Sequence, residues 1–221
     1  MGSGCGERVI PQGRILCVLH HTEKPFFTRR SPHTMSVSNR RGDTMKQPSS
    51  LWQAAGFALT TFGGTLLHFW YEWSDGNILT APFSGVNEST WEHMKLLFWP
   101  LVLFAFLQRH FFREKENYWC IKLAGILLGL TLIPVLFYTY NGIFGKSSHW
   151  INIAIFYISA ALVFLFERRA FQTDRLPCRY PLLALGAICM IGALFVVFTF
   201  MPPQIPLFRD PLTGTYGLPG A

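Results

Sequence analysis

Charged residues are scarce in this sequence. Only 14% of its 221 residues are Asp, Glu, Lys or Arg, whereas 50% are hydrophobic and 16% are aromatic. Soluble domains carry roughly 25% charged residues, so this chain lacks the polar surface that covers a domain in water. The composition therefore excludes an ordinary soluble protein and predicts a protein embedded in a lipid bilayer.

Several motifs that mark common activities are also missing. The sequence contains no HExxH, no CxxC, no Cys/His pair with zinc spacing, no glycine-rich phosphate loop, no nucleophile elbow and no internal repeat. Cys120 and Cys178 fall in loops that the charge distribution assigns to the cytoplasm, and Cys189 lies within a hydrophobic run. Because thiols on the reducing side of a membrane stay unpaired, no disulfide is expected.

Four long stretches of the chain carry no charged residue at all: residues 47–71, 123–145, 147–166 and 180–208. A helix needs about 20 largely apolar residues to cross ~30 Å of hydrocarbon. Each stretch is long enough, so all four are predicted to span the membrane.

A fifth hydrophobic segment, residues 96–108, is shorter and reaches only about 20 Å as a helix with a rise of ~1.5 Å per residue. To cross the bilayer, this helix must also include residues 91–95, which contain Glu92, His93 and Lys95. The alternative is a half-crossing, re-entrant segment, which needs protein or water around its backbone. We favour the full span because it fits the distribution of charge.

Lysine and arginine gather in two of the connections. Cytoplasmic loops are enriched in these residues. Segments 109–122 and 168–179 hold four each, whereas segment 74–90 holds none. The sequence thus predicts an all-α integral membrane protein, a five-helix transmembrane bundle with a cytoplasmic N-terminus and an extracytoplasmic C-terminus.

The predicted spans lie at about residues 51–71, 90–109, 121–143, 149–167 and 181–201, followed by an extracytoplasmic tail at 202–221. The net charge of +7 is explained by this topology, so the expected partner is the lipid bilayer and no nucleic acid is expected. Five helices enclose only a small pathway, so a transport function would call for a homo-oligomer.

Residues 1–44 differ from the rest of the chain. They are polar, rich in Arg, His, Pro and Ser, and contain no apolar stretch long enough for a signal peptide. One interpretation is a disordered cytoplasmic tail. Another is that translation begins at Met45, because residues 45–48 have the look of a bacterial start and codons for Arg40 and Arg41 can form a ribosome-binding sequence. Residues 45–221 are expected to form a single transmembrane domain.

Ionisable side chains gather at the predicted outer ends of the spans. His68 and Glu72 lie one turn apart at the end of the first span, and Glu88, Glu92 and Lys95 share a helical face around the start of the second. Such groups are costly in a membrane helix and usually face a cavity or a partner. The candidate polar cluster consists of His68, Glu72, Asn87, Glu88, Glu92, His93, Lys95, His149, Asn152 and Asp210.

Most of these residues also have a structural interpretation. Ser89 and Glu92 fit a capping box, in which each side chain bonds the other residue's backbone amide. Lys95 can neutralise Glu88 or Glu92, or extend its amine to the interface. His68 with Glu72 can form an oriented pair between helices. The concentration of all these groups on one side of the membrane is harder to explain by structure alone.

The same residues carry a resemblance to a known family. The sequence resembles an uncharacterised family of small bacterial multi-pass membrane proteins, a domain of unknown function. The matching segments are 68–74 (HFWYEWS), 86–98 (VNESTWEHMKLLF), 133–135, 138–140, 203–211 and 213–217. The resemblance implies a multi-pass fold in a bacterial plasma membrane, and it implies no reaction.

Three functions are compatible with the sequence, and whether the protein is an enzyme is left open. The one we favour is a polar cluster with a binding, structural or scaffold role. A second is a membrane-embedded hydrolase that uses a divalent metal to attack lipid-like substrates. A third is a small proton- or ion-coupled transporter subunit. The candidate metal ligands are His68, Glu72, Glu88, Glu92 and His93.

Overall fold

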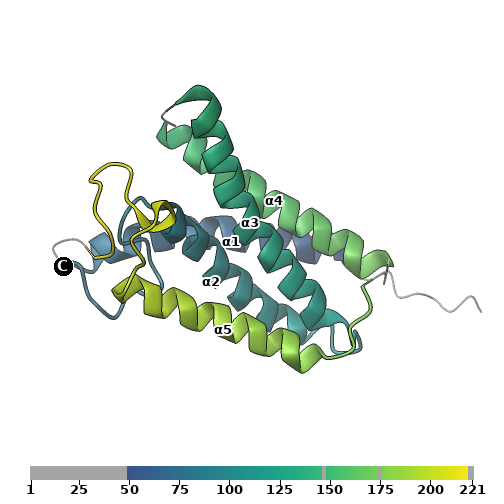
Figure 1. Ribbon diagram of the computed structural model, residues 1–221. Helices are drawn as coiled ribbons and strands as arrows, with labels where there is room; N and C mark the ends of the chain where they lie inside the picture. The colour runs from purple at the N-terminus through teal and green to yellow at the C-terminus, as the bar shows by residue number, and fades with distance from the viewer. Residues whose placement is uncertain (1–48, 146–147, 174–175, 219–221) are drawn as a thin grey trace, which may run out of the picture. The chain divides into compact units, whose positions relative to one another are not determined.

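The computed structural model describes residues 49–145, 148–173 and 176–218, and the predictions for residues 1–44 fall outside this range. The described chain is all-α. Its only pairing of extended segments is an isolated bridge between Arg209 and Tyr216. Its helices (Figure 1) are α1 (Ser49–Trp73), α2 (Thr90–Arg109), α3 (Tyr118–Phe144), α4 (His149–Thr173), α5 (Pro181–Phe200) and the short 3-10 helix η1 (Pro206–Phe208).

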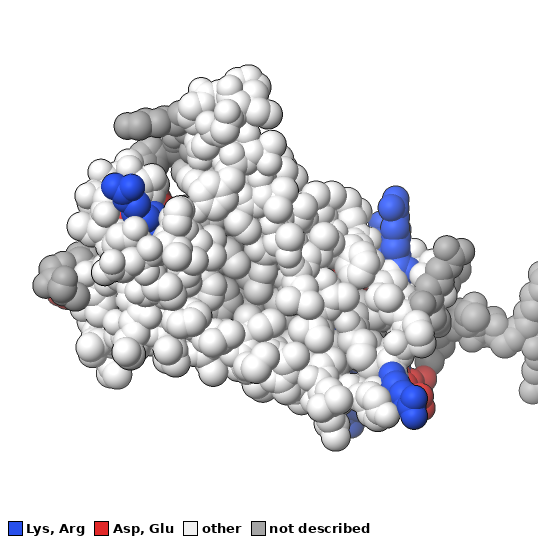
Figure 2. Space-filling model, in the orientation of Figure 1, with Lys and Arg blue, Asp and Glu red and all other residues white. Residues whose placement is uncertain are grey.

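The helices lie close to the predicted spans. α2 has the predicted bounds and is one continuous helix of 20 residues, which corresponds to about 30 Å. Three helical segments are long and apolar enough to cross a membrane, namely Tyr118–Phe144, Trp150–Thr173 and Pro181–Phe200. This fits a membrane protein. On the face drawn in Figure 2, almost all charged side chains lie toward the ends of the helices.

α2 is the central helix of the bundle and packs against the other four and against η1. It is therefore buried along much of its length, including its charged first turns. Two glycines let α1 approach closely. A Cβ on Gly56 would meet the rings of Phe104 and Phe164 at 2.4 Å, and a Cβ on Gly64 would lie 2.9 Å from the carbonyl oxygen of Leu96. Glu92 and Lys95, the charged residues of the first turns of α2, are thus enclosed by protein.

The basic end of the bundle differs from the prediction in two ways. The charge count assigned Lys122 to the connection at 109–122, but it lies inside α3, fully buried, with its Nζ 2.6 Å from Glu167 Oε2 on α4. Its ammonium also lies over the rings of Phe104 and Tyr118. Burial against a carboxylate and aromatic rings provides the partners that a charge needs inside a protein.

The second difference concerns the cysteines. Cys120 and Cys178 form a disulfide, with their Cα atoms 5.9 Å apart, so the expectation that both thiols stay unpaired was wrong. The physical reason is that the first turn of α3, which holds Cys120 and was expected to be loop, meets the α4–α5 connection at the same end of the bundle. The sequence separation of 58 between the two cysteines hides this proximity. Cys189 is free and exposed.

Candidate functional site

The predicted polar cluster divides into a structural clamp and a separate group of histidine and glutamate side chains. In the clamp, Lys95 Nζ lies 2.6 Å from Glu92 Oε2, and both side chains are buried. Lys95 also donates to the carbonyl oxygen of Ala81 and to Thr199 Oγ1. Glu92 accepts from the backbone N–H of Val86. Lys95 therefore does not extend to an interface, and Glu92 is occupied by structural contacts.

The capping box is present only in part. Ser89 Oγ accepts a hydrogen bond from the backbone N–H of Glu92, which caps α2. The return bond is absent because the N–H of Ser89 donates to Asn87 Oδ1 instead, and the Glu92 carboxylate reaches back to Val86. The loop before α2 is therefore held by Asn87 and Glu92 together.

The C-terminal tail closes over this loop. Asn87 Nδ2 donates to the carbonyl oxygen of Gly217. The ring of Phe208, from η1, lies 4.5 Å from that of Trp91. Asp210 is buried and accepts from the backbone N–H of Leu212, so it holds a turn within the tail. Asn87 and Asp210 thus contribute to structure, although 130 positions separate Asn87 from Gly217 in the sequence.

The second group consists of His68 on α1, Glu88 in the loop and His93 on α2. One ligand atom from each lies within 4.8 Å of the others. His68 Nε2 is 3.5 Å from Glu88 Oε1, and His93 Nε2 is 3.7 Å from Glu88 Oε2. The loop is fixed near His68 because the N–H of Gly85 donates to the carbonyl oxygen of Leu67. We call these three residues the triad.

The spacing within the triad fits a shared ion better than direct hydrogen bonds. Nitrogen-to-oxygen hydrogen bonds are usually 2.7–3.2 Å long, and both contacts are longer. Ligands that surround zinc tetrahedrally at about 2.0–2.1 Å lie about 3.3 Å apart. The contacts of His68 and His93 with the two oxygens of the Glu88 carboxylate are close to that value, and one ligand atom from each residue lies within 4.8 Å of the others.

The backbone orients one of the histidines. Nδ1 of His93 is 2.9 Å from the carbonyl oxygen of Ser89. A carbonyl oxygen can only accept, so Nδ1 carries the proton, and in the neutral ring Nε2 is left with a free lone pair facing Glu88. Metal-bound histidines usually have such a hydrogen bond on their second nitrogen. The site therefore has one nitrogen, Nε2 of His93, that is already oriented to serve as a metal ligand.

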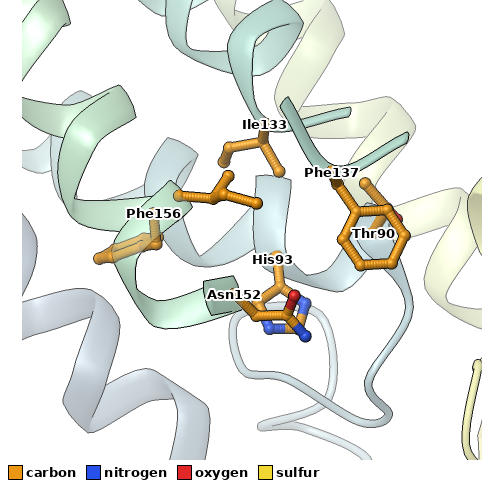
Figure 3. Close-up of a pocket in the computed structure, with 7 residues that line it drawn as sticks. Thr90, His93, Ile133, Phe137, Asn152 and Phe156 are labelled. Carbon is orange, nitrogen blue, oxygen red and sulfur yellow. The ribbon is translucent and has the colours of Figure 1, made fainter. Parts of the chain in front are cut away.

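The triad opens into a cavity of about 500 Å³ between α1, α2 and α4. Glu72, which is exposed, lies on its wall, and so does the half-buried Asn152 from α4. Figure 3 shows Asn152 and His93 at a smaller adjoining cavity. The remaining lining is mostly apolar: Gly64, Thr65, Phe69, Leu96, Ile153, Phe156 and Tyr157. The cavity thus combines a polar group at one end of the bundle with apolar helix surfaces.

Of the ten residues in the candidate cluster, the structure brings five to this cavity: His68, Glu72, Glu88, His93 and Asn152. The side chain of His149 lies outside the described residues. Sequence reasoning missed Thr199, which contacts Lys95 from the end of α5. A single threonine near the end of a hydrophobic run gives no signal that could have found it.

The side chains of the triad are of the types that coordinate divalent cations. Two imidazoles and one carboxylate are the donor set of catalytic zinc sites and of non-haem iron sites, which leave positions open for water or substrate. The side chains are partly exposed, at 34% for His68, 26% for Glu88 and 15% for His93. An ion held there would therefore remain accessible from the cavity.

Comparison with known proteins identifies the family of this chain. It finds no relative of known function. No curated protein and no solved structure matches the chain. A family profile matches residues 43–218, which include all five helices, the triad and the clamp. The predicted resemblance to an uncharacterised domain is confirmed, and the chain belongs to a family of unknown function (DUF6512).

Proposed function

We propose that this protein binds a divalent metal ion, of the zinc class, through His68, Glu88 and His93, and uses it to hydrolyse a lipid-like substrate. The observation that carries the proposal is the convergence of three ligand atoms within 4.8 Å at the wall of a large cavity. The donor set is the one that hydrolytic zinc enzymes use, with an open position for water.

A divalent ion held by the triad would make a nearby water more acidic and would polarise an ester or phosphoester group. Glu72 is the candidate general base, because it lines the same cavity and lies one helical turn beyond His68. Its carboxylate accepts a proton from water, the water oxygen forms a new bond to the acyl carbon or phosphorus, and the bond to the alcohol breaks. Glu72 then returns the proton to the departing alkoxide.

The cavity favours an amphipathic substrate. Its polar groups come from His68, Glu72 and the loop, whereas Phe69, Ile153 and Tyr157 provide exposed apolar surface on α1 and α4. A lipid chain gains free energy by lying on such surface, and its polar linkage would then face the triad. This supports a lipid-like substrate over a freely soluble one.

The proposal includes a five-span topology in a bacterial plasma membrane, with the triad on the extracytoplasmic side. It is supported by the exposed arginines at the opposite end, among them Arg113, Arg168 and Arg169. The Cys120–Cys178 disulfide lies at this basic end and is the observation that counts against this orientation, because disulfides are rare in the reducing cytoplasm.

Metal analysis of the purified protein tests the proposal. The parent should carry close to one zinc ion per chain, and His68→Ala and His93→Ala should lose it. His110→Ala, an exposed histidine at the other end of α2, is the matched control and should keep the metal. A folded parent that carries no metal, and whose melting temperature does not rise with added Zn²⁺, Fe²⁺ or Mn²⁺, would contradict the proposal.

Glu72→Gln separates binding from chemistry. The variant should keep its metal and lose hydrolysis of a phospholipid or lipid-ester substrate, because only the base is removed. Equal hydrolysis by parent and variant would exclude Glu72 as the base.

A second candidate is a binding or scaffold protein without catalysis. It is favoured by the clamp, because Glu92 and Lys95 hold the loop on α2 and so account for part of the polar cluster without any reaction. Metal retention without hydrolysis of any lipid would favour this candidate.

A further inference from the structure

A second groove lies between α1 and α4 at the opposite, basic end of the bundle. It has a volume of about 270 Å³. Two helical stripes face each other across it, each with the i, i+3, i+4, i+7 spacing of one helix face. The stripes are Ser50, Gln53, Ala54 and Phe57 on α1, and Ala161, Phe164, Leu165 and Arg168 on α4.

The groove is polar at one end only. α1 begins and α4 ends at the basic end, so Ser50, Gln53 and Arg168 lie together there. Toward the middle of the bundle the lining becomes apolar, with Phe57 and Ala161. The groove thus offers a cation and an amide at one end and hydrocarbon at the other. This polarity matches the headgroup and the acyl chain of one lipid molecule that lies along the helices.

Gln53 provides an independent indication of a ligand. Its side chain is 4% exposed, yet neither Nε2 nor Oε1 has a hydrogen-bond partner among the described residues. Buried amides are normally satisfied, because leaving one without partners is unfavourable. A bound group with both an acceptor and a donor would satisfy Gln53, and no side chain in the described part of the chain does so.

The positive charge of Arg168 favours an anionic ligand. It is exposed at the rim of the groove, and the structure shows no acid paired with it in the described chain. A guanidinium pairs strongly with phosphate oxygens through two parallel hydrogen bonds. Basic pockets between membrane helices typically bind anionic lipid headgroups.

We propose that this groove binds an anionic glycerophospholipid of the phosphatidylglycerol class. Arg168 donates to the phosphate at the rim, and the Gln53 side chain, which lines the groove, turns its amide toward the headgroup to gain the partners that it lacks. One acyl chain lies over Phe57 and Leu165. This site is independent of the triad and holds whether or not the triad binds metal.

The experiment is a titration of the full-length purified protein in a neutral detergent with phosphatidylglycerol, phosphatidylcholine or inorganic phosphate, read by native mass spectrometry and melting temperature. Phosphatidylglycerol should remain bound and raise the melting temperature, and the other two should not. Arg168→Gln should weaken binding about fivefold, the expected effect of one basic contact with an anionic lipid. Leu165→Trp, at an exposed position, should weaken binding by filling the groove.

Arg169→Gln is the matched control, because Arg169 is also exposed but does not line the groove. It should bind phosphatidylglycerol like the parent. Equal losses in Arg168→Gln and Arg169→Gln would indicate a diffuse charge effect and overturn the proposal. Equal binding of phosphatidylcholine, or stabilisation by inorganic phosphate alone, would overturn it as well.

Discussion

Replacing Lys95 by methionine tests how much the clamp contributes to stability. Lys95 is fully buried and makes three polar contacts, to Glu92, Ala81 and Thr199. Methionine has a similar length but no charge, so the Glu92 carboxylate keeps only the N–H of Val86 as a partner. Leaving one member of a buried ion pair unpaired typically costs about 3–5 kcal/mol.

The converse change should cost less. In Glu92→Gln, Lys95 keeps its bonds to Ala81 and Thr199, and the new amide oxygen can still accept from its ammonium. We therefore expect the loss of one charge-assisted bond, about 1.5–3 kcal/mol. This exceeds the mild effect that a cap alone predicts, because the structure shows Glu92 to be an ion-pair partner as well.

Thermal unfolding in one detergent measures these differences. For a domain of this size, 1 kcal/mol corresponds to roughly 2–4 °C, so Lys95→Met should lower the melting temperature by roughly 6–20 °C. The double variant Lys95→Met/Glu92→Gln should be at least about 2 kcal/mol more stable than additivity predicts, because the unpaired charge is gone.

Glu72→Gln is the control for this series. Glu72 is exposed and lies near the C-terminal end of α1, where the helix dipole disfavours an acid. Its removal should leave stability within about 0.5 kcal/mol of the parent, or raise it slightly. Additive losses in the double variant, or a loss in Glu72→Gln as large as in Lys95→Met, would refute the assignment of Lys95 and Glu92 to a structural clamp.

Two further predictions concern topology and the basic end of the bundle. In a cysteine-free background, a membrane-impermeant thiol reagent added to intact cells should label Leu79→Cys and Thr215→Cys and spare Gln172→Cys; labelling of Gln172→Cys alone would reverse the orientation. Lys122→Met should destabilise the protein by about 3–5 kcal/mol in thermal unfolding, with partial recovery on adding Glu167→Gln; unchanged stability of Lys122→Met would show that the pair is not maintained in the protein.

The sequence by itself determined which segments form helices. Long uncharged runs and the start of α2 are local features, because a helix depends on residues within a few turns of one another. Even α2, with its charged first turns, therefore had the predicted bounds. The same local reasoning placed His68 and Glu72 one turn apart at one end of the bundle.

Only the tertiary structure decided which side chain meets which. Glu88 precedes α2 and Glu92 lies in its first turn, and the sequence made both equally good candidates for metal ligands. Packing directs Glu92 inward, to Lys95, and holds Glu88 in a loop beside His68. The pairing of Lys122 with Glu167 was likewise invisible, because it depends on how α3 lies against α4. Helix periodicity gives the face of each residue, whereas the partner across that face depends on the packing of the whole bundle.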